Sequence, residues 1–178
     1  MTFAHPFWLA GTATTSGNLE NVIHPGDGQV VGQYHVPTKD QVEQAVAAAW
    51  NVRHEFARTT AAQRAEALLH ISKRLAERVD EIAKLIVEEN GKPLLWAKAE
   101  AGRATTVFRW AAEEVRRFSG EIQRLDTEVA AAGRMAIIRR FPHGPVLGIS
   151  PFNFPMNLVA HKVAPAIAVG APIIIKLS

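Results

Sequence analysis

The sequence contains no cysteine, so its 178 residues offer no disulfide, no thiolate zinc site and no cysteine nucleophile. It also lacks an uncharged apolar run of the roughly 18 residues that a membrane-spanning helix needs. The first residues (MTFAHPFWLAG) have neither the basic start nor the long apolar centre of a secretory signal. These absences favour a cytoplasmic protein that does not contact the membrane.

Several site signatures are missing as well. The seven histidines form no i, i+4 pair and no ligand cluster, which argues against a metal site. There is no P-loop and no Gly-x-Gly-x-x-Gly fingerprint. The basic residues are not interleaved with aromatic ones, so the sequence gives no nucleic-acid signal.

The composition, 48% hydrophobic and 21% charged, is ordinary for one globular domain or for one domain and part of another. Charge is uneven along the chain: residues 1–102 hold 10 basic and 12 acidic side chains, whereas residues 103–178 hold 10 and 5. The +5 charge of the second part favours an anionic dinucleotide ligand. A solvated surface, or a contact with acidic residues elsewhere, explains it equally well.

Local patterns predict a hairpin followed by helices. Residues 18–36 carry β-forming residues on both sides of a Pro-Gly-Asp-Gly turn. Capping-box spacings, Thr-x-x-Gln, precede apolar stripes that predict helices at 39–56 and from 61 to 90. The second helix should break near Asp80, whose side chain can cap a new helix start, and should end at Asn90-Gly91, a left-handed cap. A third helix, over 94–118, should bury a stripe that runs from Ala97 through Phe108 to Phe118.

The last thirty residues predict a βαβ unit, because an apolar strand, a Pro/Asn-rich turn, a helix and a second apolar strand follow one another. Ligands of open α/β sheets bind at the carboxyl ends of the strands. Asn153 follows the first strand, and Lys176 and Ser178 end the second. Residues 173–175, three isoleucines, should expose an unpaired apolar edge that promotes aggregation.

Three pieces of this segment resemble the aldehyde dehydrogenase superfamily. They are Pro151-Phe152-Asn153-Phe154-Pro155, the stretch 162–170 (KVAPAIAVG), and Lys176-Leu177-Ser178. They stand in the family's register, because Lys176 follows Asn153 by 23 positions. Looser resemblance extends upstream through Asn90-Gly91-Lys92-Pro93. The wording is most similar to the lactaldehyde and non-phosphorylating glyceraldehyde-3-phosphate dehydrogenase subgroup.

The resemblance implies an α/β fold: the start of an open parallel-sheet dinucleotide-binding domain, preceded by a β-hairpin and a helical block. It divides the chain into a hairpin and helical part (1–120), an extended oligomerisation arm (121–144) and a first βαβ unit (145–178). The catalytic domain is absent from this division. Homo-oligomers, dimers or tetramers, are the expected assembly.

The resemblance also assigns roles to five residues. The Asn153 amide would donate to the oxyanion that forms when a thiolate attacks an aldehyde. Lys176 would bind the adenosine ribose of NAD or NADP with Ser178 beside it, and Ser150 and Phe152 would line the cofactor. The alternatives are an Asn153 that caps the following helix or bonds its own backbone, and a Lys176 that simply extends into solvent. Leu177 replaces the family's usual proline, and Phe152 its usual tryptophan.

Two hypotheses for function follow. The leading one is the amino-terminal part of an NAD(P)-dependent dehydrogenase that oxidises a small aldehyde to a carboxylic acid. It would be inactive alone, because the nucleophilic cysteine and the general-base glutamate belong to later family sequence. The alternative is a non-catalytic paralogue that pairs subunits or binds a dinucleotide.

Overall fold

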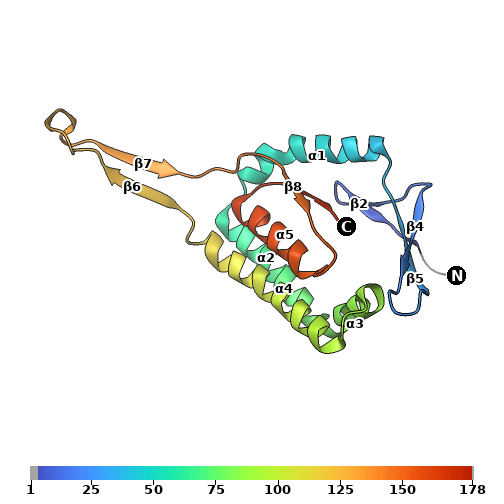
Figure 1. The fold of residues 1–178 in the computed structure, drawn as a ribbon. Coiled ribbons are helices and arrows are strands. Elements are labelled where there is room, and N and C mark those ends of the chain that lie inside the picture. The colour runs from blue at the N-terminus through green and yellow to red at the C-terminus, as the bar shows by residue number, and fades with distance from the viewer. Residues whose placement is uncertain (1–3, 178) are drawn as a thin grey trace.

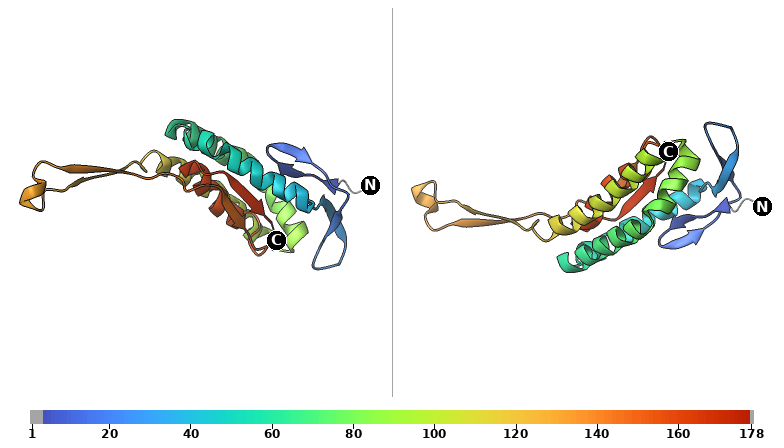
Figure 2. Two further views of the ribbon diagram at one scale, coloured as in Figure 1. Left: turned by 90° about the horizontal axis from the view of Figure 1, so that it is seen from above. Right: turned by 90° about the horizontal axis from the view of Figure 1, so that it is seen from below.

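The computed structural model describes residues 4–177. Figure 1 shows helices at the centre, small β-sheets at the amino-terminal end, and a long hairpin that projects from the opposite end. The views in Figure 2 show the hairpin extending away from the helices from above and below as well. The molecule is therefore elongated along the hairpin.

The amino-terminal strands form two sheets. The predicted hairpin of residues 18–36 is confirmed: β4 (Leu19–Ile23) pairs antiparallel with β5 (Val30–His35), and β1 (Ala4–His5) adds to β5 in parallel. A second hairpin, β2 (Phe7–Leu9) with β3 (Thr12–Thr14), was not predicted. Its strands are too short to show alternation, and Ala10 at its turn has a positive φ of 49°, which non-glycine residues rarely adopt.

Helices α1 (Lys39–Ala57) and α2 (Ala61–Glu77) begin where the capping boxes predicted. In each, the threonine side chain accepts from the backbone N–H of a glutamine three residues later, and that glutamine's side chain accepts from the threonine N–H. Both hydrogen bonds satisfy backbone N–H groups that would have no partner at an uncapped helix start. These two helix starts are thus fixed by local sequence.

The predicted break near Asp80 is confirmed in place, but the proposed cause is wrong. Helix α3 (Val79–Asn90) begins after Arg78, and no side chain caps its start. The Asp80 carboxylate instead pairs with Lys98 at 2.7 Å. Gly91 ends α3 in the left-handed conformation, φ 69°, as the Asn-Gly pair indicated.

Helix α4 (Leu94–Val115) supplies most of the buried stripe that its sequence predicted. Ala97, Ala101, Ala104 and Phe108 are buried, and α2, α3 and α5 pack against this helix. The prediction is wrong at Phe118, which is 54% exposed. The helix ends at Val115 rather than at 118, so Phe118 leaves the stripe and its ring lies beside the Arg140 guanidinium.

Residues 120–139 form the projecting hairpin. Strands β6 (Gly120–Arg124) and β7 (Met135–Arg139) pair antiparallel, and a short 3₁₀ turn, η1 (Val129–Ala131), lies between them. The extended conformation expected from 121 onward is therefore interrupted at its tip. We call residues 120–139 the arm.

The carboxyl-terminal βαβ unit is confirmed. Strand β8 (Val146–Ile149) pairs in parallel with β9 (Ile173–Lys176), and the connecting helix α5 (Asn157–Val169) packs on α4. A Cβ atom at Gly148 would lie 2.5 Å from Ile175 Cδ1 and 3.2 Å from Lys162 Cδ, so any larger residue here would require these side-chain ends to move. Mixed α/β structure with parallel strands agrees with the predicted fold class.

The β8–β9 sheet exposes its apolar side chains differently from what was predicted for the three isoleucines of residues 173–175. Within the described residues β9 pairs only with β8, so its other edge is unpaired as predicted. The β9 isoleucines, however, are only half-exposed, because α1 and α5 both contact this strand. Leu147 and Ile149 of β8 are more open, at 64% and 61%.

The main core lies where α2, α4 and α5 meet. It is built largely from alanines around Leu68 and Phe108, so the helix backbones approach closely. A smaller cluster of Ala83, Ile86 and Ala97 joins α3 to α4. None of the helices within residues 4–177 combines the length and the apolar character needed to cross a bilayer.

Candidate functional site

The candidate site lies at the carboxyl ends of β8 and β9. Ile149 is the register partner of Lys176, and the Ser150 N–H donates to the Lys176 carbonyl oxygen at 3.2 Å. Two predicted site residues are thus adjacent. The Lys176 side chain is exposed and has no polar partner in the described part of the chain, an arrangement that fits both ligand binding and simple extension into solvent.

Ser150 is placed differently from Lys176. It is 2% exposed, and within the described residues its Oγ has no hydrogen-bond partner. A buried hydroxyl without a partner is costly, so such groups often mark functional positions. Because its backbone N–H is already bonded, any polar contact with a cofactor must come from Oγ or the carbonyl group.

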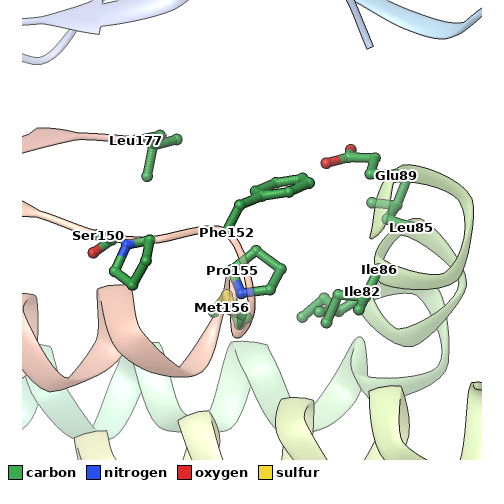
Figure 3. A pocket seen from close by; sticks show the side chains of 10 residues that line it. Ile82, Leu85, Ile86, Glu89, Ser150, Phe152, Pro155, Met156 and Leu177 are labelled. Atoms are coloured by element: carbon green, nitrogen blue, oxygen red, sulfur yellow. The ribbon is translucent and has the colours of Figure 1, made fainter. Parts of the chain in front are cut away.

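A cavity of about 280 Å³ opens between this strand end and helix α3. Figure 3 shows Ser150, Phe152 and Leu177 on one side and α3 on the other, with the Phe152 ring pointing toward Leu85 and Glu89. Its lining is mainly apolar. Burial raises the pKa of the Glu89 carboxyl, an effect that nearby His5 partly opposes.

The turn at residues 151–156 connects β8 to α5 and carries Asn153. Contacts from the end of α3 hold its backbone. The Asn90 side chain donates to the Phe152 carbonyl oxygen at 2.7 Å, and Lys92 Nζ donates to the Asn153 carbonyl oxygen at 2.7 Å. The Lys92 ammonium also lies 4.0 Å from the centroid of the Phe154 ring. Three successive residues of the turn are therefore held by the same segment of the chain.

Glu100 of α4 holds the end of the turn. Its side chain is fully buried, and Oε1 accepts from the backbone N–H groups of Met156 and Asn157 at 2.9 and 3.1 Å. Its other oxygen, Oε2, forms an ion pair with Lys92. A carboxylate at the first amides of α5 satisfies two open donors and interacts favourably with the helix dipole.

Asn153 itself is exposed, and its side-chain amide has no hydrogen-bond partner among residues 4–177. Helix α5 begins at Asn157 after Met156, with no side-chain cap. Among the described residues, Asn153 therefore neither caps the helix nor bonds its own backbone, the two alternative interpretations of this residue. Its backbone is fixed while its amide is free to bind a ligand.

The structure brings the predicted residues together only in part. Ser150 and Phe152 line the cavity, whereas Asn153 and Lys176 do not. Ser178 lies outside the described residues. No cluster of three or more potential metal ligands occurs within residues 4–177.

No site role was predicted for three residues of the site: Asn90 and Lys92, which stand in a stretch of family wording, and Glu100. For Glu100 a signal existed, because it falls between Ala97 and Ala104 on the predicted buried face of α4. A carboxylate at a core position needs a buried partner. No local pattern indicates that this partner is Lys92 and the start of α5.

Comparisons with known proteins agree on one family. Residues 12–178 match the family described as "Aldehyde dehydrogenase family". A 3-sulfolactaldehyde dehydrogenase from Priestia megaterium is 34% identical over 170 residues, which cover 95% of this chain and 35% of that protein. The chain thus spans about a third of the length of the curated relatives it matches.

Solved structures give the same result. The crystal structure of aldehyde dehydrogenase 21 from Physcomitrella patens, in complex with the reaction product succinate, matches with a TM-score of 0.95 and 34% identity over 99% of this chain and 37% of that one. NADP-dependent glyceraldehyde-3-phosphate dehydrogenase from Bacillus halodurans, complexed with NADP, matches with a TM-score of 0.93 and 29% identity. Its match covers 98% of this chain and 37% of that one.

Proposed function

Because this chain belongs to the aldehyde dehydrogenase family, we propose that it forms the amino-terminal part of an NAD(P)-dependent enzyme that oxidises a small aldehyde to a carboxylic acid. The nucleophilic thiolate and the general base come from sequence outside these residues, which contain no cysteine. We use "complete enzyme" for the polypeptide that includes that sequence. A bound NAD or NADP supplies the hydride acceptor.

The observation that carries the proposal is the state of Asn153. Its amide is exposed and unbonded, while hydrogen bonds donated by Asn90 and Lys92 and accepted by Glu100 fix the turn around it. An oxyanion donor needs this combination, because a donor that is already oriented stabilises developing charge without reorganising. The role we assign to Asn153 is donation to the oxygen of the tetrahedral intermediate.

The test is an assay of the complete enzyme with a panel of small aldehydes, including lactaldehyde, glyceraldehyde 3-phosphate and succinic semialdehyde. The 3-sulfolactaldehyde, glyceraldehyde-3-phosphate and succinate chemistry named for the relatives supports this choice. Formation of reduced nicotinamide with at least one aldehyde is expected. No turnover with any of them, in a folded protein that binds the dinucleotide, would contradict the proposal.

Lys176 is the residue we assign to the dinucleotide, with Ser150, Phe152 and Ser178 as further contacts. It stands at the carboxyl end of a parallel strand, where ligands of open sheets bind. Replacing Lys176 by methionine is expected to raise the Kd for NAD or NADP about tenfold, the size of one charge-assisted hydrogen bond. Titration calorimetry of the complete enzyme measures this change.

Lys73→Met is the control for that measurement, since Lys73 is an exposed lysine of α2 away from the strand ends. It removes the same charge and should leave the Kd unaltered. Equal Kd values for the wild-type protein and Lys176→Met would mean that Lys176 extends into solvent without binding the cofactor. The same titrations, run with both dinucleotides, establish which one the protein prefers.

The arm, which falls largely within the predicted 121–144 segment, is proposed to pair subunits. Ile122 and Ile137 are register partners on opposite strands, and they are 73% and 72% exposed. Such an apolar pair on a projecting hairpin is typical of a surface that another chain covers. We propose a homo-oligomer, dimer or tetramer, in which the arm contacts a second subunit.

Replacing both isoleucines by glutamate is expected to weaken subunit association by at least about a hundredfold, because each buried isoleucine contributes about 1.5–3 kcal/mol. Light scattering across a dilution series would show a smaller mass for this variant. Gln123→Glu is the matched control, since Gln123 is exposed on the same strand. If the mass of the assembly does not change with the double substitution, the arm is excluded as the subunit contact.

The exposed arm also bears on the alternative function, a non-catalytic module that pairs subunits. A protein that associates through the arm, yet oxidises no aldehyde and leaves NAD and NADP unbound, would support that alternative. Activity in the complete enzyme would exclude it. The two measurements together therefore separate the two functions.

A further inference from the structure

We propose that Lys92 and Glu100 are positioning residues for Asn153, so that a buried ion pair between the α3–α4 connection and α4 sets the catalytic geometry. The inference rests on the proposed function, because it assigns these residues a role in placing the oxyanion donor. Neither residue touches the substrate. They act through the backbone of the turn.

The first observation is the position of the Lys92 ammonium. It donates to the carbonyl oxygen of Asn153 itself at 2.7 Å and to the Glu100 carboxylate, and it lies over the Phe154 ring. Only 12% of its side chain is exposed. A lysine that is this enclosed, with all its contacts on one turn and one carboxylate, has little freedom to move.

The second observation is the distribution of contacts along the turn. Lys92 fixes the carbonyl group of Asn153, and Glu100 fixes the amides of Met156 and Asn157, three and four residues later. The ion pair joins these two anchor points to each other. The backbone between them is therefore held at both ends by one connected pair of charges.

The third observation is the contrast with Lys98, which lies on the same helix as Glu100. Lys98 pairs with Asp80, but its side chain is 49% exposed and that of Asp80 is 77% exposed. Exposed pairs of this kind contribute little to stability. The Lys92–Glu100 pair, by contrast, is buried and bonded to the backbone that carries the free Asn153 amide.

Position matters here because an oxyanion donor works only within hydrogen-bond distance of the reacting oxygen. A displacement of about 1 Å in a catalytic group can cost about a hundredfold in rate. Loss of either anchor would let the turn rotate and carry the Asn153 amide away. We therefore expect changes at Lys92 and Glu100 to lower kcat rather than dinucleotide affinity.

The test is a double-mutant cycle in the complete enzyme, between the ion pair and Asn153. Lys92→Met combined with Glu100→Gln removes both charges together, so no buried charge is left unpaired. We expect this change to lower kcat about tenfold or more, with a nearly constant KM for the dinucleotide. In an Asn153→Ala background the same change should lower kcat no further.

The outcomes distinguish the positioning role of the ion pair from the proposed oxyanion role of Asn153. An equal fold-loss of kcat in the Asn153→Ala background would overturn the positioning role, since the pair would then act independently of Asn153. Lys98→Met is the matched control and should leave kcat unaltered in both backgrounds. Wild-type kcat in Asn153→Ala alone would instead refute the proposed oxyanion role.

A second variant keeps the proposal testable if the double variant of Lys92 and Glu100 fails to fold. Lys92→Arg keeps the positive charge beside Glu100, but its planar guanidinium does not reproduce both bonds of the ammonium in the same places. It is expected to fold and to show a reduced kcat with a nearly constant dinucleotide KM. A kcat equal to that of the wild-type enzyme would overturn the proposal.

Discussion

Replacing Asn153 by alanine is expected to lower kcat for aldehyde oxidation by about 10²–10³-fold, the usual effect of removing one oxyanion donor. The amide is exposed and makes no hydrogen bond within the described residues, so its removal breaks no contact of the fold. Stability and dinucleotide affinity should therefore change little. The loss should fall on the step in which charge develops on the carbonyl oxygen.

Single-turnover kinetics of the complete enzyme would measure this step directly. Asn153→Asp is a useful companion, because it keeps the size of the side chain but presents a negative charge to the developing oxyanion; it should be at least as slow as alanine. Asn51→Ala, at an exposed position on α1, controls for loss of a surface amide. If Asn153→Ala reacts as fast as the wild-type enzyme, the oxyanion donor lies elsewhere.

Replacing Glu100 by alanine is expected to cost about 3–5 kcal/mol of unfolding free energy, as is typical when one partner of a buried ion pair is removed. The change leaves the enclosed Lys92 ammonium without its carboxylate, and the amides of Met156 and Asn157 without their acceptor. Each of these losses is costly, because the Glu100 carboxylate that supplies the acceptors is fully buried. Urea denaturation would measure the change.

Two controls show whether burial of Glu100 causes the expected loss of unfolding free energy. Glu113→Ala removes a carboxylate from the same helix, but Glu113 is half-exposed in its pair with Arg109, so a change within about 1 kcal/mol is expected. Replacing both Lys92 and Glu100 by methionine should recover part of the loss, since no unpaired charge remains. A Glu100→Ala variant as stable as Glu113→Ala would show that the pair is not a structural anchor.

Features with short-range causes were predictable from the sequence. Both capping boxes lie within four residues, and they placed the starts of α1 and α2. Asn90-Gly91 placed the end of α3 for the same reason. Phe118 was predicted wrongly because periodicity does not show where a helix ends; the chain leaves the helix at Val115 without a glycine or proline to mark the position.

The residues predicted for the candidate site are those at the strand ends. Ser150, Asn153 and Lys176 stand at or just after the ends of β8 and β9, where both the strand pattern and the motif wording predicted a ligand site. Glu100 and Lys92 belong to the same site through contacts between distant segments, which no local pattern encodes. The division of the chain at residues 120 and 144 remains a prediction.

The hydrogen bonds that fix the Asn153 turn have a consequence for the order of folding. They join residues 56 to 62 positions apart, whereas each capping box joins residues three apart. Closing long loops costs chain entropy before any contact compensates it, so distant pairings form slowly. We therefore expect the turn to acquire its geometry only after α4 and α5 have docked. A substitution in the alanine-rich core that slows docking would delay the onset of activity without altering any residue of the site.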